Sequence, residues 1–211
     1  MLVMRFLQQC RIAGAHPFFA ALIYLYHRLS GRAVFAHHRA IFAGSGEIRT
    51  GGLLRVGMDE VGFVHRYDRT YMNINGRLEF SGPYSIGKGC RFDIATGATV
   101  RFGTGCVRPF TTFVIMHGLT VGNECSISWG CQFLDEDFHH LSYEGRKERA
   151  PEIVIGDRVW IGCNVTVLKG SRIPDGCVVA AGSVISSVFT QQNCIIGGNP
   201  ARVIRENISW Y

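Results

Sequence analysis

A branched aliphatic residue recurs at every sixth position in the C-terminal part of the chain. A small or apolar residue stands four places after most of these positions. The aliphatic positions are Ile155, Ile161, Val167, Ile173, Val179 and Ile185, and the positions that follow them are Val159, Val165, Ser171, Cys177 and Ser183. A period of six matches neither the 3.6-residue repeat of a buried helical face nor simple strand alternation. The pattern therefore indicates short rungs separated by corners, with the aliphatic side chain pointing inward each time.

Three such rungs close a triangular coil of about 18 residues, and each coil hydrogen-bonds to the next as parallel strands do, at about 4.8 Å. The interior of such a coil is narrow and dry, so its inward residues must be branched and apolar. Glycine, asparagine and aspartate tolerate tight corners, and these residues stand at Gly156, Asp157, Asn164, Asp175 and Gly176. We therefore predict an all-β chain that forms a parallel β-helix, in preference to unrelated buried strands of a sandwich.

The cysteines favour neither a disulfide framework nor a metal site. The chain has eight, with no C-x-x-C pair. Those that fall at the small position of a hexad, where a compact apolar side chain suits the interior, are Cys90, Cys125, Cys131 and Cys177. Such cysteines are typical of reduced thiols, so we expect a cytoplasmic location. The net charge of +6 is too modest to indicate nucleic acid but is compatible with a phosphate-bearing cofactor or an anionic polymer.

Residues 1–32 differ in sequence pattern from the rest of the chain. The apolar run from Phe18 to Tyr26 is far shorter than the roughly 20 residues of a membrane span, and no cleavage site follows it. We predict a helix over residues 17–29 that caps the open end of the solenoid. Peripheral membrane association is the alternative for these apolar side chains. The solenoid is assigned to residues 33–205, with a tail at 206–211, and its last part (IIGGNPARVIREN) is expected to form one rung and a short helix.

The hexad phase breaks between Phe133 and Ile155, because their separation of 22 residues is not a multiple of six. Residues 135–151 (DEDFHHLSYEGRKERAP) are polar and are predicted to leave the coil as an excursion loop. Long loops on a rigid scaffold often carry function. An imidazole, with its ordinary pKa near 6.5, suits proton transfer at neutral pH, so His139 and His140 are the candidate bases.

The stretch IGDRVWIGCNVTVLKGSRIPDGCVVAAGSVI, followed by IIGGNPARVIRE, resembles the hexapeptide-repeat acyltransferase family, most closely the bacterial sugar and capsular polysaccharide O-acetyltransferases. The resemblance covers residues 121–210. It implies a left-handed parallel β-helix, acetyl-CoA as co-substrate, a saccharide acceptor, no metal, and a homotrimer with active sites between subunits. The implied reaction is transfer of an acetyl group to a saccharide hydroxyl by direct attack.

The same resemblance implies roles for single residues. In CSISWGCQFLDEDFHH the family's Asp-x-His pattern makes His139 the general base and Asp137 a carboxylate that can orient it. His140 stands where the family often has proline and is taken as a neighbour. Trp160 is expected to point outward, either into a pocket shared with an adjacent subunit or into a trimer contact. The residues expected to contact coenzyme A are Trp160, Gly162, Cys163, Ala181, Gly182, Arg202 and Arg205.

Two other function classes stay open. One is a catalytically inert β-helix scaffold, which the joint presence of Asp137, His139, Trp160 and the NPAR segment disfavours. The other is a metal-dependent hydratase resembling the γ-type carbonic anhydrases, which need three convergent zinc ligands, two of them from a His-x4-His pair. His117, His139 and His140 do not have that spacing.

Overall fold

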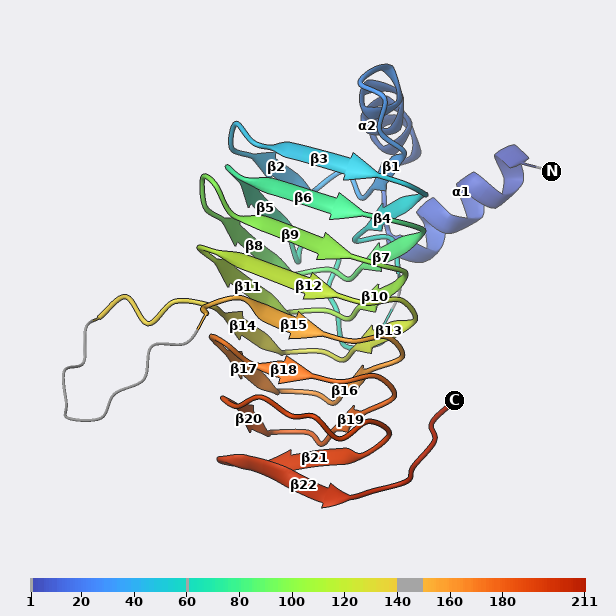
Figure 1. Ribbon diagram of the computed structural model, residues 1–211. Coiled ribbons are helices and arrows are strands. Elements are labelled where there is room, and N and C mark those ends of the chain that lie inside the picture. The colour runs from blue at the N-terminus through green and yellow to red at the C-terminus, as the bar shows by residue number, and fades with distance from the viewer. Residues whose placement is uncertain (1, 60, 140–149) are drawn as a thin grey trace.

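The computed structural model describes residues 2–59, 61–139 and 150–211 of the 211-residue chain. Three sheets form the faces of a prism, and the chain visits them in turn as it descends from the N-terminal end (Figure 1). Within the described residues, neighbouring strands pair in parallel except for the last two, β21 and β22. The path of the chain around the prism axis is left-handed, so the fold is the predicted left-handed parallel β-helix (Figure 1).

The sheets are called faces A, B and C here, and the edges between them the AB, BC and CA corners. Face A contains β1 (Val34–Ala36), β4 (Leu54–Val56), β7 (Tyr84–Ile86), β10 (Gly105–Val107), β13 (Cys125–Ile127), β16 (Trp160–Ile161), β19 (Val178–Val179), β21 (Ile195–Gly198) and β22 (Ala201–Arg205). Face B contains β2 (Ile41–Ala43), β5 (Tyr71–Ile74), β8 (Arg91–Ile94), β11 (Thr112–Ile115), β14 (Gln132–Leu134), β17 (Thr166–Leu168) and β20 (Val184–Ile185). Face C contains β3 (Glu47–Thr50), β6 (Arg77–Phe80), β9 (Thr99–Phe102), β12 (Gly118–Val121), β15 (Ile153–Ile155) and β18 (Arg172–Ile173).

The six aliphatic positions of the repeat are buried, each with 2% or less of its surface exposed, as the period of six predicts. The small positions that follow them are buried as well, and the Ser171 hydroxyl donates to the Ile185 carbonyl at 3.0 Å. In these lower coils Trp160 pairs with Val178, eighteen residues further on. The predicted 18-residue coil therefore holds for this part of the chain.

The coils above are wider and are filled by aromatic rings. Phe92, Phe113 and Phe133 stack inside the prism with ring centroids 4.5 and 4.7 Å apart. Here Cys106 pairs with Ser126, twenty residues further on, so each coil has room for a larger side chain. This difference explains why the six-residue period is clean only in the lower part of the chain.

Two helices precede the solenoid. The second, α2 (Pro17–Leu29), matches the predicted helix and lies over β1 at the N-terminal end (Figure 1). The first, α1 (Leu2–Ala13), was not predicted from the sequence. Its C-terminal end is held by the buried Lys88, whose ammonium group donates to the Ala13 carbonyl at 2.5 Å. No helix in the described part of the chain is long and apolar enough to span a membrane.

The structure corrects two further expectations. A second excursion leaves the coil between β4 and β5; its described residues, 57–59 and 61–70, are here called the upper excursion. It follows the AB corner, where the Phe63 ring lies 6.2 Å from Phe110 and 5.5 Å from Trp129. The C-terminal segment forms an antiparallel hairpin, not a rung and a helix, because β22 pairs back onto β21 and satisfies the last backbone edge of face A.

The stability of the N-terminal layer is expected to depend on pH. Burial lowers the pKa of His27 and of His37 to about 4. His37 Nδ1 accepts the Arg39 N–H at 3.1 Å, which leaves Nε2 to donate to the Gly14 carbonyl and fixes a neutral ring. The unfolded chain binds these protons at its ordinary pKa, near 6.5, so the free energy of unfolding falls as the pH drops from about 6.5 toward about 4.

We therefore expect a lower melting temperature, measured by circular dichroism, at about pH 5 than at about pH 7.5. The variant His37→Gln keeps a donor for the Gly14 carbonyl but cannot titrate, so its melting temperature should vary less over this interval. Equal melting temperatures of the wild-type protein at the two pH values would contradict the assignment.

Candidate active site

The predicted excursion of residues 135–151 leaves the prism at the BC corner, directly after β14. Its first residue, Asp135, is completely buried. The Asp135 carboxylate accepts backbone N–H groups of the coil above, from Met116 at 2.6 Å, His117 at 2.8 Å and Gly118 at 2.7 Å. Three charge-assisted hydrogen bonds fix the point at which the excursion departs.

The next two residues also carry carboxylates that are held in place. Glu136 Oε2 lies 2.8 Å from His117 Nε2, and Glu136 Oε1 accepts the backbone N–H groups of Asp137 and Phe138. The hydrogen bond from His117, with help from the two backbone groups, lowers the pKa of Glu136 to about 2. Asp137 forms an ion pair at 2.5 Å with Lys169, which belongs to the coil below. The base of the excursion is thus tied to the coils on both sides.

His139 lies two residues after Asp137 and is exposed. Among the described residues the Asp137 carboxylate contacts Lys169, and no hydrogen bond joins Asp137 to His139. The orienting role of Asp137 stays a prediction. His140 lies outside the described residues, as do the positions up to 149.

Trp160 stands on face A with its side chain directed outward and 42% exposed. Its indole N–H donates to the Ser128 hydroxyl at 3.2 Å. Its ring lies 6.2 Å from that of Trp210, whose own N–H donates to the Arg158 carbonyl at 2.9 Å. The C-terminal tail therefore reaches the outer surface of face A beside Trp160.

Four of the residues expected to contact coenzyme A, Gly162, Cys163, Ala181 and Gly182, stack at the AB corner. The Gly182 N–H donates to the Cys163 carbonyl at 2.9 Å, so Cys163 and Ala181 occupy the same corner in successive coils. Gly162 is buried, and a Cβ atom there would overlap the backbone of Ala181, so only glycine allows the two coils to approach. The corner is left with small side chains and a partly exposed backbone.

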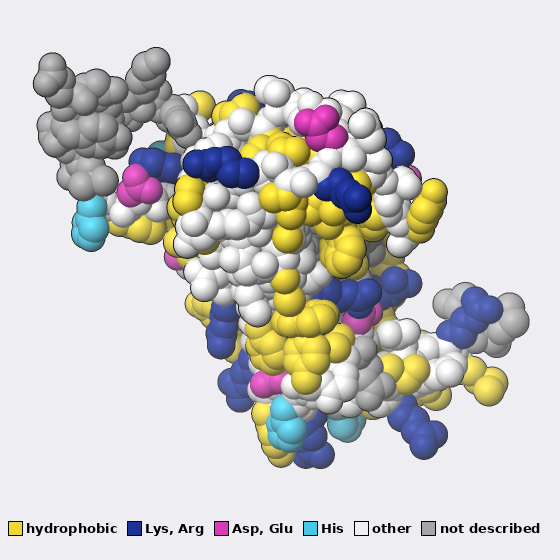
Figure 2. All heavy atoms as spheres, turned by 90° about the horizontal axis from the view of Figure 1, so that it is seen from below, with side chains coloured by type: hydrophobic (Ala, Val, Ile, Leu, Met, Phe, Trp, Pro, Cys, Tyr) yellow, Lys and Arg dark blue, Asp and Glu magenta, His cyan; other side chains and the backbone are white. Residues whose placement is uncertain are grey.

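The two arginines of the terminal hairpin lie at different ends of β22. Arg202 pairs with Gly197, next to the AB corner, whereas Arg205 pairs with Ile195, about 10 Å away along the strand. The end of the solenoid that β22 closes displays more Lys and Arg than Asp and Glu (Figure 2). The backbone of Arg202 therefore lies on the AB side of face A, and that of Arg205 on the CA side.

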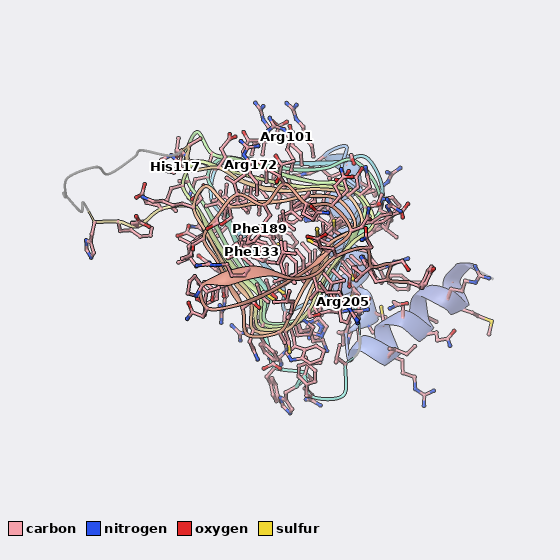
Figure 3. All side chains as sticks on the ribbon, turned by 60° about the horizontal axis from the view of Figure 1, so that its bottom comes forward. Arg101, His117, Phe133, Arg172, Phe189 and Arg205 are labelled. Atoms are coloured by element: carbon pink, nitrogen blue, oxygen red, sulfur yellow. The ribbon has the colours of Figure 1, made fainter. Side chains whose placement is uncertain are left out.

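A single chain does not bring the two halves of the predicted site together. His139 follows the BC corner, whereas Trp160 lies on face A and Cys163 and Ala181 at the AB corner. The described ends of the excursion and β16 lie on opposite sides of the solenoid (Figure 1). Seen along the solenoid, His117 marks the edge from which the excursion leaves, and Arg205 lies across the prism from it (Figure 3).

Several contacts at the site were not found by sequence reasoning. Asp135 and Glu136 were seen only as parts of a polar loop, and their partners His117 and Lys169 belong to other coils. Asp135 comes two residues after the inward residue Phe133, so strand alternation turns its side chain inward as well. At the end of the rung its carboxylate can reach the coil above. Among the described residues, no group of three or more His, Cys, Asp or Glu side chains is placed to hold a metal ion.

Comparisons with known proteins agree with the fold. The family model described as bacterial transferase hexapeptide (six repeats) matches residues 152–187. An uncharacterized 24.8 kDa protein in the cps region of Klebsiella pneumoniae is 42% identical over 157 residues, which cover 74% of this chain and 71% of the relative. A probable macrolide acetyltransferase of Lysinibacillus sphaericus is 31% identical over 150 residues, which cover 67% and 71%.

A third relative is the polysialic acid O-acetyltransferase of Escherichia coli O1:K1, which is 28% identical over 143 residues, covering 66% of this chain and 44% of the relative. The repeat, the β-helix and these similarities agree. The chain belongs to the hexapeptide-repeat acyltransferase family.

Proposed function

We propose that the protein is an acetyl-CoA-dependent O-acetyltransferase that acetylates a hydroxyl of a cell-surface saccharide, capsular or O-antigen, or of its precursor, with His139 as the general base. The observation that carries the proposal is the position of His139, which is exposed and lies two residues after Asp137. The three successive carboxylates of residues 135–137 attach the start of the excursion to the β-helix. The relative named polysialic acid O-acetyltransferase and the relative from a cps region support a saccharide acceptor.

The proposed chemistry is direct transfer. A neutral imidazole of His139 removes the proton of the acceptor hydroxyl as its oxygen attacks the thioester carbonyl carbon. The tetrahedral intermediate collapses by breaking the carbon–sulfur bond, and the coenzyme A thiolate takes the proton from the imidazolium. The products are an acetyl ester and free coenzyme A, and the base returns to its neutral form. The enzyme itself forms no covalent intermediate.

Coenzyme A is proposed to lie along the AB corner. Small side chains at Cys163 and Ala181 and the backbone of Gly182 let an extended pantetheine arm approach the β-helix closely. Arg202, at the lower end of the same corner, can meet phosphate oxygens with its guanidinium group. Arg205 lies farther from the AB corner along β22, so it would contact only the part of the nucleotide most distant from the pantetheine arm.

Since His139 and Trp160 lie on different sides of one chain, the proposed site needs two copies. We propose a homotrimer in which the excursion of one subunit meets the AB corner and Trp160 of its neighbour. A closed ring of this kind uses two different surfaces of each chain, as heterologous contacts do. The competing hypothesis, a catalytically inert scaffold, requires neither a coenzyme A site at the AB corner nor His139.

Replacing the base tests the chemistry. His139→Ala is expected to lower kcat for acetyl transfer from acetyl-CoA by about 100-fold or more, the usual contribution of a positioned general base. His65→Ala, an exposed histidine of the upper excursion, serves as the control and should keep full activity. Turnover by His139→Ala at the wild-type rate would remove His139 from the mechanism.

Mixing two inactive variants tests the shared site. Trp160→Ala and His139→Ala are expected to be poorly active alone. In trimers assembled from equal amounts of both, about a quarter of the sites should have His139 from a Trp160→Ala copy and Trp160 from a His139→Ala copy, and those sites should be active. Activity is measured after unfolding and refolding the mixture. No recovery in mixed trimers would place both residues of a site in the same chain.

The clamp at Asp135 is expected to matter for turnover. In Asp135→Asn the new amide NH₂ group faces backbone N–H donors, which costs about 2 kcal/mol of stability and shifts the start of the excursion. We expect kcat to fall by about 10-fold or more, because small displacements of a base are costly, while KM for acetyl-CoA is unchanged.

Asp157→Asn is the matched control, since Asp157 accepts the Asn123 N–H at 2.6 Å at the CA corner. It should lose stability and keep its kcat. An Asp135→Asn protein with wild-type kcat would show that the clamp does not position His139.

A further inference from the structure

A basic pocket lies where the two N-terminal helices meet the upper excursion. Its volume is about 380 Å³, and it is bordered by the end of α1, the start of α2 and the first corner of the solenoid. The charged and titratable side chains that line it are Arg11, His16, His38, Arg39 and Arg66. No carboxylate is among the lining residues that the structure describes. The pocket is therefore a concentration of positive charge.

Two of these arginines are held close to one ring. The guanidinium carbon of Arg39 lies 4.3 Å from the centroid of the Tyr67 ring, and that of Arg66 lies 5.0 Å from it. Arg66 also donates to the Tyr67 hydroxyl at 3.1 Å. In the described part of the chain, no ion pair involves Arg11, Arg39 or Arg66. Like charges held together without a counter-charge favour binding of an anion between them.

Other donors face the same pocket. His38 Nδ1 accepts the His16 N–H at 3.0 Å, so the proton of a neutral His38 ring is on Nε2, where it can be donated. The 13-residue helix α2 begins here, and no side chain caps its N-terminus. Free backbone N–H groups and the helix dipole add to the attraction for an anion.

The two helices beside the pocket are rich in exposed apolar side chains and contain no Asp or Glu. Residues 1–46 contain five arginines and no Asp or Glu. Ala20, Ile23 and His27 of α2 pack toward the solenoid. Phe18 and Phe19, at the rim of the pocket, are 61% and 51% exposed. Further exposed apolar side chains on α1 and α2 are Val3, Met4, Leu7, Leu22, Leu25, Tyr26 and Leu29.

We propose that α1 and α2 form a docking surface for an anionic phospholipid bilayer, and that the pocket between Arg11, Arg39 and Arg66 receives a lipid phosphate. Guanidinium groups match phosphate oxygens in geometry, and exposed aliphatic and aromatic side chains enter the interface between headgroups and acyl chains. Both helices project from the N-terminal end of the solenoid, away from β16 and the lower coils (Figure 1). A second copy of the chain is a poor occupant, because a self-complementary contact would bring arginines against arginines.

The test is flotation of the full-length protein with vesicles. The wild-type protein should float with vesicles of phosphatidylcholine and phosphatidylglycerol in equal parts and should not float with phosphatidylcholine alone. Arg39→Gln combined with Arg66→Gln should lower the partition coefficient by about 30-fold, the expected effect of two charges near an anionic surface. Arg55→Gln combined with Arg91→Gln removes the same charge from exposed positions on faces A and B and should bind as the wild type does.

Each other outcome overturns the proposal. Wild-type protein that stays unbound, or a pocket variant that binds like the wild type, excludes the docking surface. Saturation by inorganic phosphate without vesicle binding makes the pocket a site for soluble phosphate. A change of oligomeric mass in the pocket variant makes the surface a contact between copies. His139→Ala should float like the wild type, so a failure of the proposed acetyl transfer leaves this result unaffected.

Discussion

The inward column of side chains is the constraint on which the rest of the structure depends. Each coil contacts only its neighbours, so the solenoid is stable only if every rung contributes a side chain that fills the interior. Fully buried residues such as Ile161, Val167 and Val179 contribute about 1.5 to 3 kcal/mol each. Wider coils achieve the same filling with Phe92, Phe113 and Phe133. A stiff prism follows, and its corners are fixed in space.

Fixed corners determine what the loops can do. The excursion at the BC corner is held by hydrogen bonds from the coil above to Asp135 and by the ion pair of Asp137 with Lys169 of the coil below, so its first residues have little freedom. The AB corner, by contrast, offers small side chains and backbone. One chain thus carries His139 beyond one corner and the proposed coenzyme A site at another. We propose that the two form a single site when copies of the chain assemble.

The sequence predicts those features that the period of six or a composition change encodes. The burial of the lower rungs, the outward position of Trp160, the helix at 17–29 and the excursion after Phe133 all follow from such local signals. The upper excursion was missed because coils of about twenty residues carry no six-residue phase that a loop could interrupt. The contacts of Asp135 join different coils, and such contacts exist only after the coils have stacked. The terminal hairpin is local in sequence, but it lies beyond the last position of the six-residue repeat, Ile185.

The most direct test of the shared site is a crystal structure of the assembled protein with bound coenzyme A. We expect the coenzyme to lie along the AB corner of one copy. Its sulfur should be about 6 Å or less from the His139 imidazole of a neighbouring copy, a distance that one acceptor hydroxyl can bridge. Coenzyme A bound with its sulfur far from every His139 of the assembly would contradict it.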